Sequence, residues 1–156
     1  MQKTDEGILL NWWQKLENDR GSRAELRRAK LPDEIVFCPA YHRLYAELKW
    51  PEKDRRKLTA IAGLAAHVKE NDSTQKLAQQ MASQKNGNNP LVSSLRFRRI
   101  LAIDNLDELY VSMIPVIRML NGRVNLLDMA VSVYWWNNKT KKEWAYSYFE
   151  IAKNEI

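Results

Sequence analysis

Residues 105–122 read NLDELYVSMIPVIRMLNG and carry the signals that decide the fold class. Apolar side chains recur there every three or four residues, as on one face of an α-helix: Leu106, Leu109, Met113, Ile117 and Leu120. Asn105 can cap the start of this helix, with Glu108 three residues on, and Asn121-Gly122 is the expected stop. Pro115 lies inside the segment and is expected to interrupt and kink it.

Helix signals of the same kind continue toward the C-terminus. Ser93 or Ser94 is expected to begin the helix before this segment, and Asn125 the helix after it. Residues 140–143, which read TKKE, match a capping box and predict the start of a last helix.

The N-terminal part is predicted to be helical as well. Gly21 should end a first helix, and residues 22–25 (SRAE) match a capping box for a second helix that ends near Leu31, before a proline. Pro39 and Pro51 can each serve as the first residue of a helix. Because no segment alternates with a period of two for long enough to make a sheet, the sequence predicts an all-α protein.

A polar stretch divides the chain. We expect an N-terminal helical half over residues 1–70, a polar connection with one short helix over 71–90, and a C-terminal helical half over 91–156. The run NGNNP at 86–90 marks the clearest break. The predicted architecture is therefore two small helical bundles joined by a polar connection.

Composition bounds the function classes. The 156 residues include 25 Lys+Arg and 19 Asp+Glu, which gives a net charge of +6 and a pI near 9.5. This balance favours a polyanionic partner. No apolar stretch approaches the ~20 residues of a membrane span, and no signal-length apolar region follows the charged N-terminal residues. The expectation is a soluble, cytoplasmic protein with no membrane partner.

Catalytic and metal-binding signatures are missing from the sequence. It contains no GxGxxG, GxxxxGK[ST], HExxH or GxSxG motif. The single cysteine, Cys38, excludes a disulfide framework, and Pro39 separates it from His42 by starting a helix. His67 is interpreted as a residue at a helix end. We expect no enzyme, no metal, no cofactor and no small-molecule substrate.

The positive charge is grouped, mostly at or near helix ends. Arginine is prominent in these groups, and its planar fork suits paired contacts with phosphate oxygens. A solvated, solubilising face is the alternative interpretation of each group. The groups are Arg23, Arg27, Arg28 and Lys30; Lys49, Lys53, Arg55, Arg56 and Lys57; Arg96, Arg98 and Arg99; Arg118 and Arg123; and Lys139, Lys141 and Lys142.

Six tryptophans are many for a chain of this size. Trp12-Trp13 and Trp135-Trp136 are adjacent pairs, and adjacent residues are about 100° apart on a helix. At most one of each pair is therefore central in a core stripe. Packing is the main expectation for the tryptophans, with an interface or stacking on an unpaired base as the other roles for a marginal ring.

Three regions, in order along the chain, carry a resemblance to a known family. They contain residues 12–16 (WWQKL) with 24–29 (AELRRA), residues 39–44 (PAYHRL), and residues 95–101 (LRFRRIL), followed by Trp135-Trp136 and residues 144–149. The chain resembles the CasB family, the small subunit of the type I-E Cascade complex in CRISPR interference.

The resemblance implies an all-helical, non-enzymatic protein in two helical parts. Its partners would be the guide RNA and target DNA with the displaced strand, the large and backbone Cascade subunits, and a second copy of itself lying head to tail. Base pairing would read the sequence while the protein supplies backbone contacts. The matching basic positions are Arg27 and Arg28, Arg43, and Arg98 and Arg99, with Arg55, Arg56 and Arg118 also carried over.

The expected function is therefore nucleic-acid binding without sequence preference, through phosphate contacts. The predicted contact residues are Arg23, Arg27, Arg28, Lys30, Arg43, Arg55, Arg56, Arg96, Arg98, Arg99 and Arg118. Two other classes stay open: a helical protein–protein adapter with a solubilising basic surface, and a helix-turn-helix regulator that reads DNA sequence.

Overall fold

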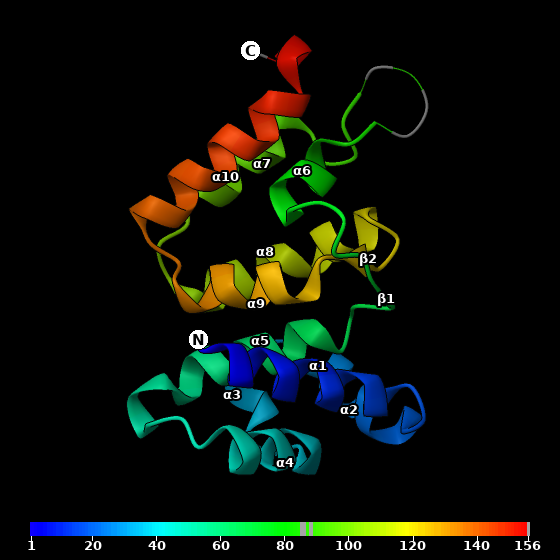
Figure 1. The fold of residues 1–156 in the computed structure, drawn as a ribbon, viewed down its shortest axis with the longest axis vertical. Coiled ribbons are helices and arrows are strands. Elements are labelled where there is room, and N and C mark those ends of the chain that lie inside the picture. Colours follow the sequence, from blue (N-terminus) through cyan, green and yellow to red (C-terminus); the bar gives the residue numbers. More distant parts are fainter. Residues whose placement is uncertain (85–86, 88, 156) are drawn as a thin grey trace.

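The structure is a computed structural model that describes residues 1–155 except 85, 86 and 88. Its helical elements form two layers (Figure 1). The lower layer contains α1 (Lys3–Leu16), α2 (Arg20–Arg28), α3 (Pro32–Ile35), α4 (Pro39–Leu48), the 3₁₀ turn η1 (Glu52–Asp54) and α5 (Arg55–Ala65). The upper layer contains α6 (Leu77–Ala82), α7 (Ser94–Leu101), α8 (Leu106–Met119), α9 (Leu126–Tyr134), α10 (Asn138–Ile151) and the 3₁₀ turn η2 (Lys153–Glu155).

The prediction of an all-α fold is confirmed, with one small addition. Strands β1 (Glu70–Asn71) and β2 (Arg123–Val124) pair in parallel, with Glu70 opposite Arg123. Two residues per strand are too few to show a period of two, so this pair could not be predicted from the sequence. The pair brings the chain leaving α5 beside the chain leaving α8.

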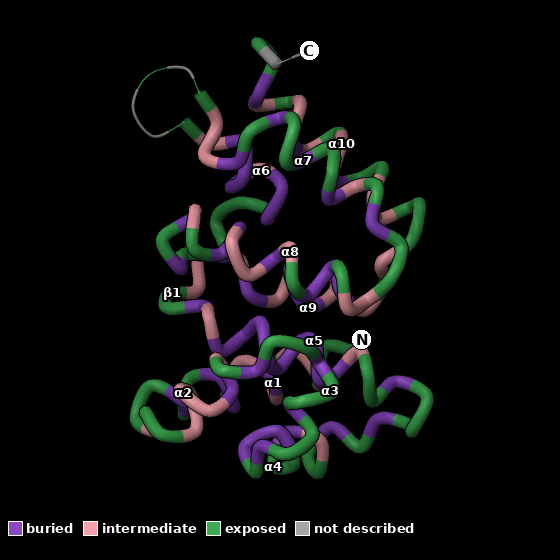
Figure 2. The backbone as a smooth tube through the Cα atoms, turned by 180° about the vertical axis from the view of Figure 1, so that it is seen from behind, coloured by how far each residue is buried: buried purple, intermediate pink, exposed green. Residues whose placement is uncertain are grey.

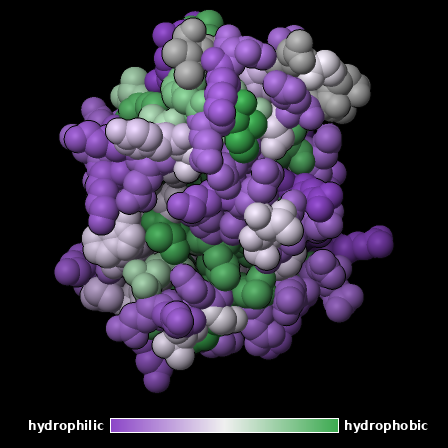
Figure 3. All heavy atoms as spheres, turned by 45° about the horizontal axis from the view of Figure 1, so that its top comes forward, coloured by the Kyte–Doolittle hydropathy of each residue, from purple (hydrophilic) through white to green (hydrophobic). Residues whose placement is uncertain are grey.

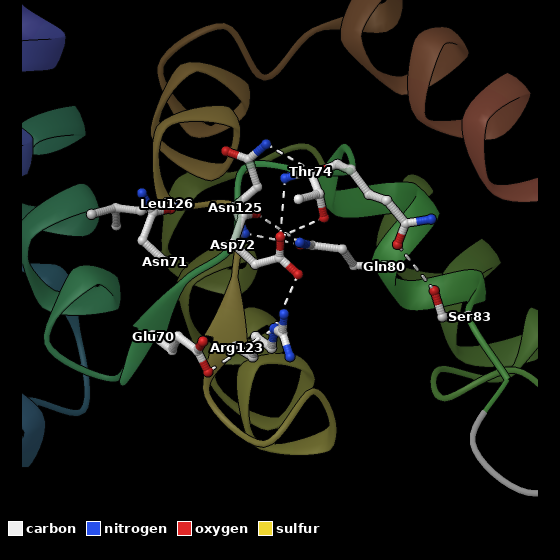
Figure 4. A network of polar contacts seen from close by, with 10 residues as sticks. Glu70, Asn71, Asp72, Thr74, Gln80, Ser83, Arg123, Asn125 and Leu126 are labelled. Atoms are coloured by element: carbon white, nitrogen blue, oxygen red, sulfur yellow. Dashed lines mark hydrogen bonds and ion pairs between the residues drawn. The ribbon is translucent and has the colours of Figure 1, made fainter.

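Polar contacts surround this pair of strands (Figure 4). Arg123 Nε donates to Asp72 at 3.0 Å, and the buried Gln80 side chain donates to the Asp72 carbonyl and accepts from the Asn125 amide. Asn71 accepts from the Leu126 amide at the start of α9. The network therefore holds β1, β2, α6 and α9 together.

Helix α5 lies at the centre of the molecule, and every residue from Leu58 to Ala65 is buried (Figure 2). It packs against α3 on one side and against α8 and α9 on the other. Gly63 allows the close approach: a Cβ there would lie 2.8 Å from the Tyr110 ring. The Tyr110 hydroxyl donates to the buried Ala29 carbonyl at 2.8 Å, which connects α8 to the end of α2.

Short helix α6, within the segment read as a polar connection, packs along α10. Its Leu77, Ala78, Met81 and Ala82 are buried. The predicted break at 86–90 lies partly outside the described residues. The division into 1–70, 71–90 and 91–156 stays a prediction.

Several predicted helix starts are confirmed. Ser93, Asn105 and Asn125 each cap their helix through the side chain, and Pro39 is the first residue of α4. Of the two candidates before α7, the structure uses Ser93, and Ser94 is the first residue of the helix.

Two predicted capping boxes are wrong. Asp19 caps α2 by accepting from the Ser22 amide, and Asn137 caps α10 by accepting from the Thr140 amide. In both cases a suitable cap lies three residues earlier and begins the helix sooner; Asn137 is a stronger cap than Thr140, whereas Asp19 and Ser22 are of similar strength. Gly21 accordingly lies inside α2, which ends at Arg28 and not near Leu31.

The prolines also behave differently from the prediction. Helix α8 continues through Pro115 to Met119. After Pro51 the chain makes the turn η1, and α5 begins only at Arg55. No helix among the described residues is long and apolar enough to span a bilayer.

Candidate nucleic-acid interface

The predicted contact residues fall into three groups, and the first points inward. Arg23 donates from Nε to the Ala66 carbonyl and from Nη2 to the Val68 carbonyl, at 3.3 and 2.8 Å. Arg27 donates from Nε to the same Ala66 carbonyl at 2.7 Å. Both side chains therefore satisfy carbonyl groups that α5 leaves without partners at its end. Burial and the charge of Arg27 lower the pKa of Arg23 from its usual value.

The second group is exposed but paired. Arg43 contacts Asp19 at 3.4 Å, and Arg55 contacts Glu52 at 3.7 Å while donating to the Tyr45 hydroxyl. Arg56 lies 2.8 Å from Asp107 on α8. Exposed pairs of this kind are worth about 0–1 kcal/mol, so a phosphate can displace the carboxylate at small cost.

The third group is exposed and forms no ion pair with any described carboxylate. Helix α7 buries Phe97 and Ile100, which turns its arginines to solvent. Most of the face shown in Figure 3 is likewise hydrophilic, around an apolar area. The members of the group are Arg28, Lys30, Arg96, Arg98, Arg99 and Arg118.

Cations from both layers meet in one hollow of about 300 Å³, which we call the cationic pocket. Arg27 of α2, Arg118 of α8 and Lys69 before β1 contribute its positive charges, and His67 lies beside them. No acidic residue lines it. The Arg27 bond to Ala66 uses Nε, which leaves its terminal amino groups without a hydrogen bond to the described residues.

His67 is neutral in this setting. Burial, together with the charges of Arg27, Arg118 and Arg23, lowers its pKa to about 4. Its Nε2 atom is buried without a hydrogen-bond partner among the described residues. Because this atom is buried, the positive charge available to an anion in the pocket comes from Arg27, Arg118 and Lys69.

Sequence reasoning placed Arg27 and Arg118 in the candidate site but omitted Lys69 and His67. Lys69 stands alone in the sequence, outside any charge cluster. It reaches the pocket because β1 pairs with β2 and brings Lys69 against Gly122, whose carbonyl accepts from the Lys69 amide at 2.8 Å. Only the paired strands could have revealed this contact.

The expectation that at most one tryptophan of each adjacent pair is central in the core is wrong for the first pair. Trp12 and Trp13 are both buried, because each indole finds a carbonyl to donate to, that of Ala40 and that of Val68. Trp136 donates to the Ile103 carbonyl and packs against Trp144. Trp135 differs, because half of its surface is exposed.

Cys38 and His42 do not form a site together. Cys38 is buried, and burial raises the pKa of its thiol to about 11. His42 Nε2 lies 2.6 Å from the Val36 carbonyl, on the surface. Among the described residues no three His, Cys, Asp or Glu side chains gather where they could hold a metal ion.

The fold and much of the sequence are shared with known proteins. The chain is 29% identical over 146 residues to the CRISPR system Cascade subunit CasB of Escherichia coli, covering 89% of each. It superposes with a TM-score of 0.74 on a chain of the E. coli Cascade crystal structure bound to a PAM-containing double-stranded DNA target, at 20% identity and covering 94% and 95% of the two chains. The crystal structure of CasB from Thermus thermophilus gives a TM-score of 0.71 at 17% identity, covering 96% and 99%.

A family model decides the assignment. The model described as CRISPR-associated protein Cse2 matches residues 22–149, which is most of the chain. This match and the E. coli relative confirm the resemblance read from the sequence. The chain therefore belongs to the CRISPR-associated Cse2 (CasB) family of Cascade subunits.

Proposed function

We propose that this chain is a non-enzymatic subunit of an RNA-guided DNA surveillance complex, where it stabilises the guide RNA–target DNA hybrid and the displaced strand. The contacts are to phosphates and carry no sequence information. Its partners are these nucleic acids, the large and backbone subunits, and a second copy of the chain. The E. coli structure that shares its fold is a Cascade complex bound to double-stranded DNA, which supports this assignment.

The cationic pocket is the observation that carries the proposal. Three cations from separate segments converge on a hollow that is lined by no acidic residue of the described chain. A surface that only keeps a protein in solution has no need to concentrate cations in a concave site. Outside the pocket, Arg28 and the arginines of α7 are exposed as well.

The structure also decides which residues should be changed in a test. Charge reversal at Arg27 would disturb the end of α5, so its effect on binding would be mixed with an effect on folding. Arg118 forms no such contact with the described residues and is exposed. Lys142 of α10, also exposed, gives a control with the same loss of charge away from the pocket.

The test measures binding of labelled single- and double-stranded oligonucleotides to wild type, Arg118→Gln and Lys142→Gln over a range of salt. The wild type should bind both without sequence preference, and Arg118→Gln should reduce the log–log salt slope by about 0.7–0.9, the contribution of one phosphate contact. Lys142→Gln should leave the slope unchanged. A wild-type slope near zero would sink the proposal and favour a protein–protein adapter. Discrimination on the order of 10³ between sequences would indicate a DNA-reading regulator instead.

A further inference from the structure

A second concave site lies at the chain between α9 and α10, where three aromatic rings line it together with charged, polar and aliphatic side chains. This aromatic hollow has a volume of about 320 Å³ and includes Tyr134, Trp135, Trp136, Asn137, Lys57 and Leu106. The α9–α10 connection lies at the left edge of Figure 1. The volume is at the small end of ligand sites, of the size that one planar ring system fills.

The rings are held by their own polar groups. The Tyr134 hydroxyl donates to Asp54 at 3.1 Å, and the Trp136 indole donates to the Ile103 carbonyl at 2.8 Å. Trp135 contacts Tyr134 edge to face, with ring centroids 4.8 Å apart, and its carbonyl accepts from the Thr140 hydroxyl. Trp135 is thus a positioned ring, yet 50% of its surface is exposed.

One cation belongs to this hollow. Lys57 Nζ lies 4.3 Å from the Tyr134 ring centroid and 5.5 Å from that of Trp135. Lys57 forms no ion pair in the described part of the chain, and the acidic residue of the hollow, Asp104, is paired with Lys141 at 2.8 Å. The cation–π position is therefore filled from within, so a cationic ligand would be repelled.

A ligand that fits must combine a flat π surface with negative charge. Unpaired nucleotides have both, and stacking on an aromatic side chain is how single strands are bound without sequence preference. An exposed tryptophan could also anchor a protein partner, but Lys57 with its unpaired charge beside the ring favours a phosphate.

We infer that the aromatic hollow receives one unpaired base of a single-stranded nucleic acid, with the base stacked on Trp135 and the adjoining phosphate on Lys57. The inference deepens the proposed function and rests on it. It gives the chain a way to prefer the unpaired strand over a duplex, whose bases are stacked on one another and not available to the ring.

The test uses the full chain with two labelled oligonucleotides of equal length, oligo(dT) and an abasic strand with the same sugar–phosphate backbone. Trp135→Ala should weaken binding of oligo(dT) by about 5- to 100-fold and leave binding of the abasic strand unchanged. Trp135→Leu, which keeps an apolar side chain without the π face, should behave in the same way. Trp135→Phe should recover part of the loss.

Matched controls separate stacking from charge and from folding. Phe37, which is 83% exposed and lies between α3 and α4, provides an aromatic control, and Phe37→Ala should bind both strands as the wild type does. Lys57→Gln should weaken both strands and lower both salt slopes by about 0.7. Circular dichroism should show that Trp135→Leu keeps the helical fold.

The outcomes are distinct. The inference is wrong if wild type, Trp135→Ala and Trp135→Leu bind oligo(dT) equally well. It is equally wrong if these variants bind oligo(dT) as the wild type does and lose binding to a protein partner, because Trp135 would then belong to a protein interface. An equal loss of affinity for oligo(dT) and for the abasic strand also contradicts the inference, because Trp135 would then affect contacts with the sugar–phosphate backbone and not with a base. If the wild type binds neither strand, the proposed function itself fails.

Discussion

At the residue scale, His67 shows how neighbouring charges control a single titration. Arg23 and Arg27 approach it from α2, and Arg118 from α8, while Lys69 lines the same pocket. Burial, followed by the charges of Arg27, Arg118 and Arg23, lowers its pKa from 6.5 to about 4. In the unfolded chain the same imidazole titrates near 6.5.

This difference predicts how stability depends on pH. Between about pH 6.5 and 4 the unfolded chain binds a proton that the folded chain does not, so the free energy of unfolding should decrease as the pH falls through that window. Above about pH 6.5 both states are neutral and the effect disappears. His67→Gln should flatten the slope between about pH 7 and 5, measured by urea unfolding at each pH.

The choice of window keeps other groups out of the measurement. Asp19 and Asp72 have pKa values lowered by hydrogen bonds to Ser22 and Thr74, so they lose their stabilising contribution only at more acidic pH. If the wild type and His67→Gln have the same slope, the cations of the pocket do not act on His67 as described.

Single residues also show what the sequence could not reveal. Arg27 and Arg28 are adjacent and chemically identical, yet Arg27 donates to the Ala66 carbonyl, 39 residues away, while Arg28 faces solvent. The difference is set by where the end of α5 lies against α2. Composition and spacing predict that a cluster is basic, but tertiary packing decides which of its members can reach a ligand.

At the element scale, helix starts depend on competition between neighbouring candidates. Where one cap residue precedes the apolar stripe, as Asn105 does for α8, the sequence predicts the boundary correctly. Before α2, Asp19 and Ser22 are both suitable, and the structure uses the earlier one. The whole helix then starts before the position that the capping box indicated.

This correction can be tested directly. Asp19→Ala should lower the free energy of unfolding by about 0.5–2 kcal/mol, because the Ser22 amide loses its acceptor. Ser22→Ala should cost less than Asp19→Ala, since it keeps the backbone amide that Asp19 caps and loses only the hydroxyl contacts with Asp19 and Arg43. Urea unfolding of both variants gives the comparison.

Asp19 also contacts Arg43, so the ion pair needs its own control. Arg43→Gln removes the pair and leaves the cap in place, and it should cost no more than about 1 kcal/mol. If Ser22→Ala lowers the free energy of unfolding more than Asp19→Ala does, Ser22 and not Asp19 is the residue that caps α2.

At the scale of the whole molecule, α5 joins what the sequence separates. Its residues read as one amphipathic face, with Leu58, Ile61 and Ala65 in the stripe, but the structure buries Thr59, Ala60 and Leu64 as well. A helix buried all round has neighbours on every side. The polar segment after it gave a visible boundary in the sequence, whereas the packing of α5 against α8 and α9 left no sequence signal.

This burial predicts that the chain unfolds as one unit. Unfolding either layer exposes the buried surface of α5, which stabilises both layers, so neither layer is expected to unfold without the other. Tryptophan fluorescence reports chiefly on α1 and on the α9–α10 region, which hold five of the six tryptophans, while far-ultraviolet circular dichroism reports on all helices. The two probes should give coincident urea transitions with a single midpoint. Two separated midpoints, or hydrogen exchange that releases α1–α4 well before α8 and α9, would contradict a shared core.

A larger side chain at the contact between the layers gives a further check. In Gly63→Ala the new methyl group meets Tyr110 of α8 and Ile35 of α3. Gly63→Ala should therefore lower the free energy of unfolding by about 1–3 kcal/mol, the cost expected of overpacking, and the fluorescence and circular dichroism midpoints should move together.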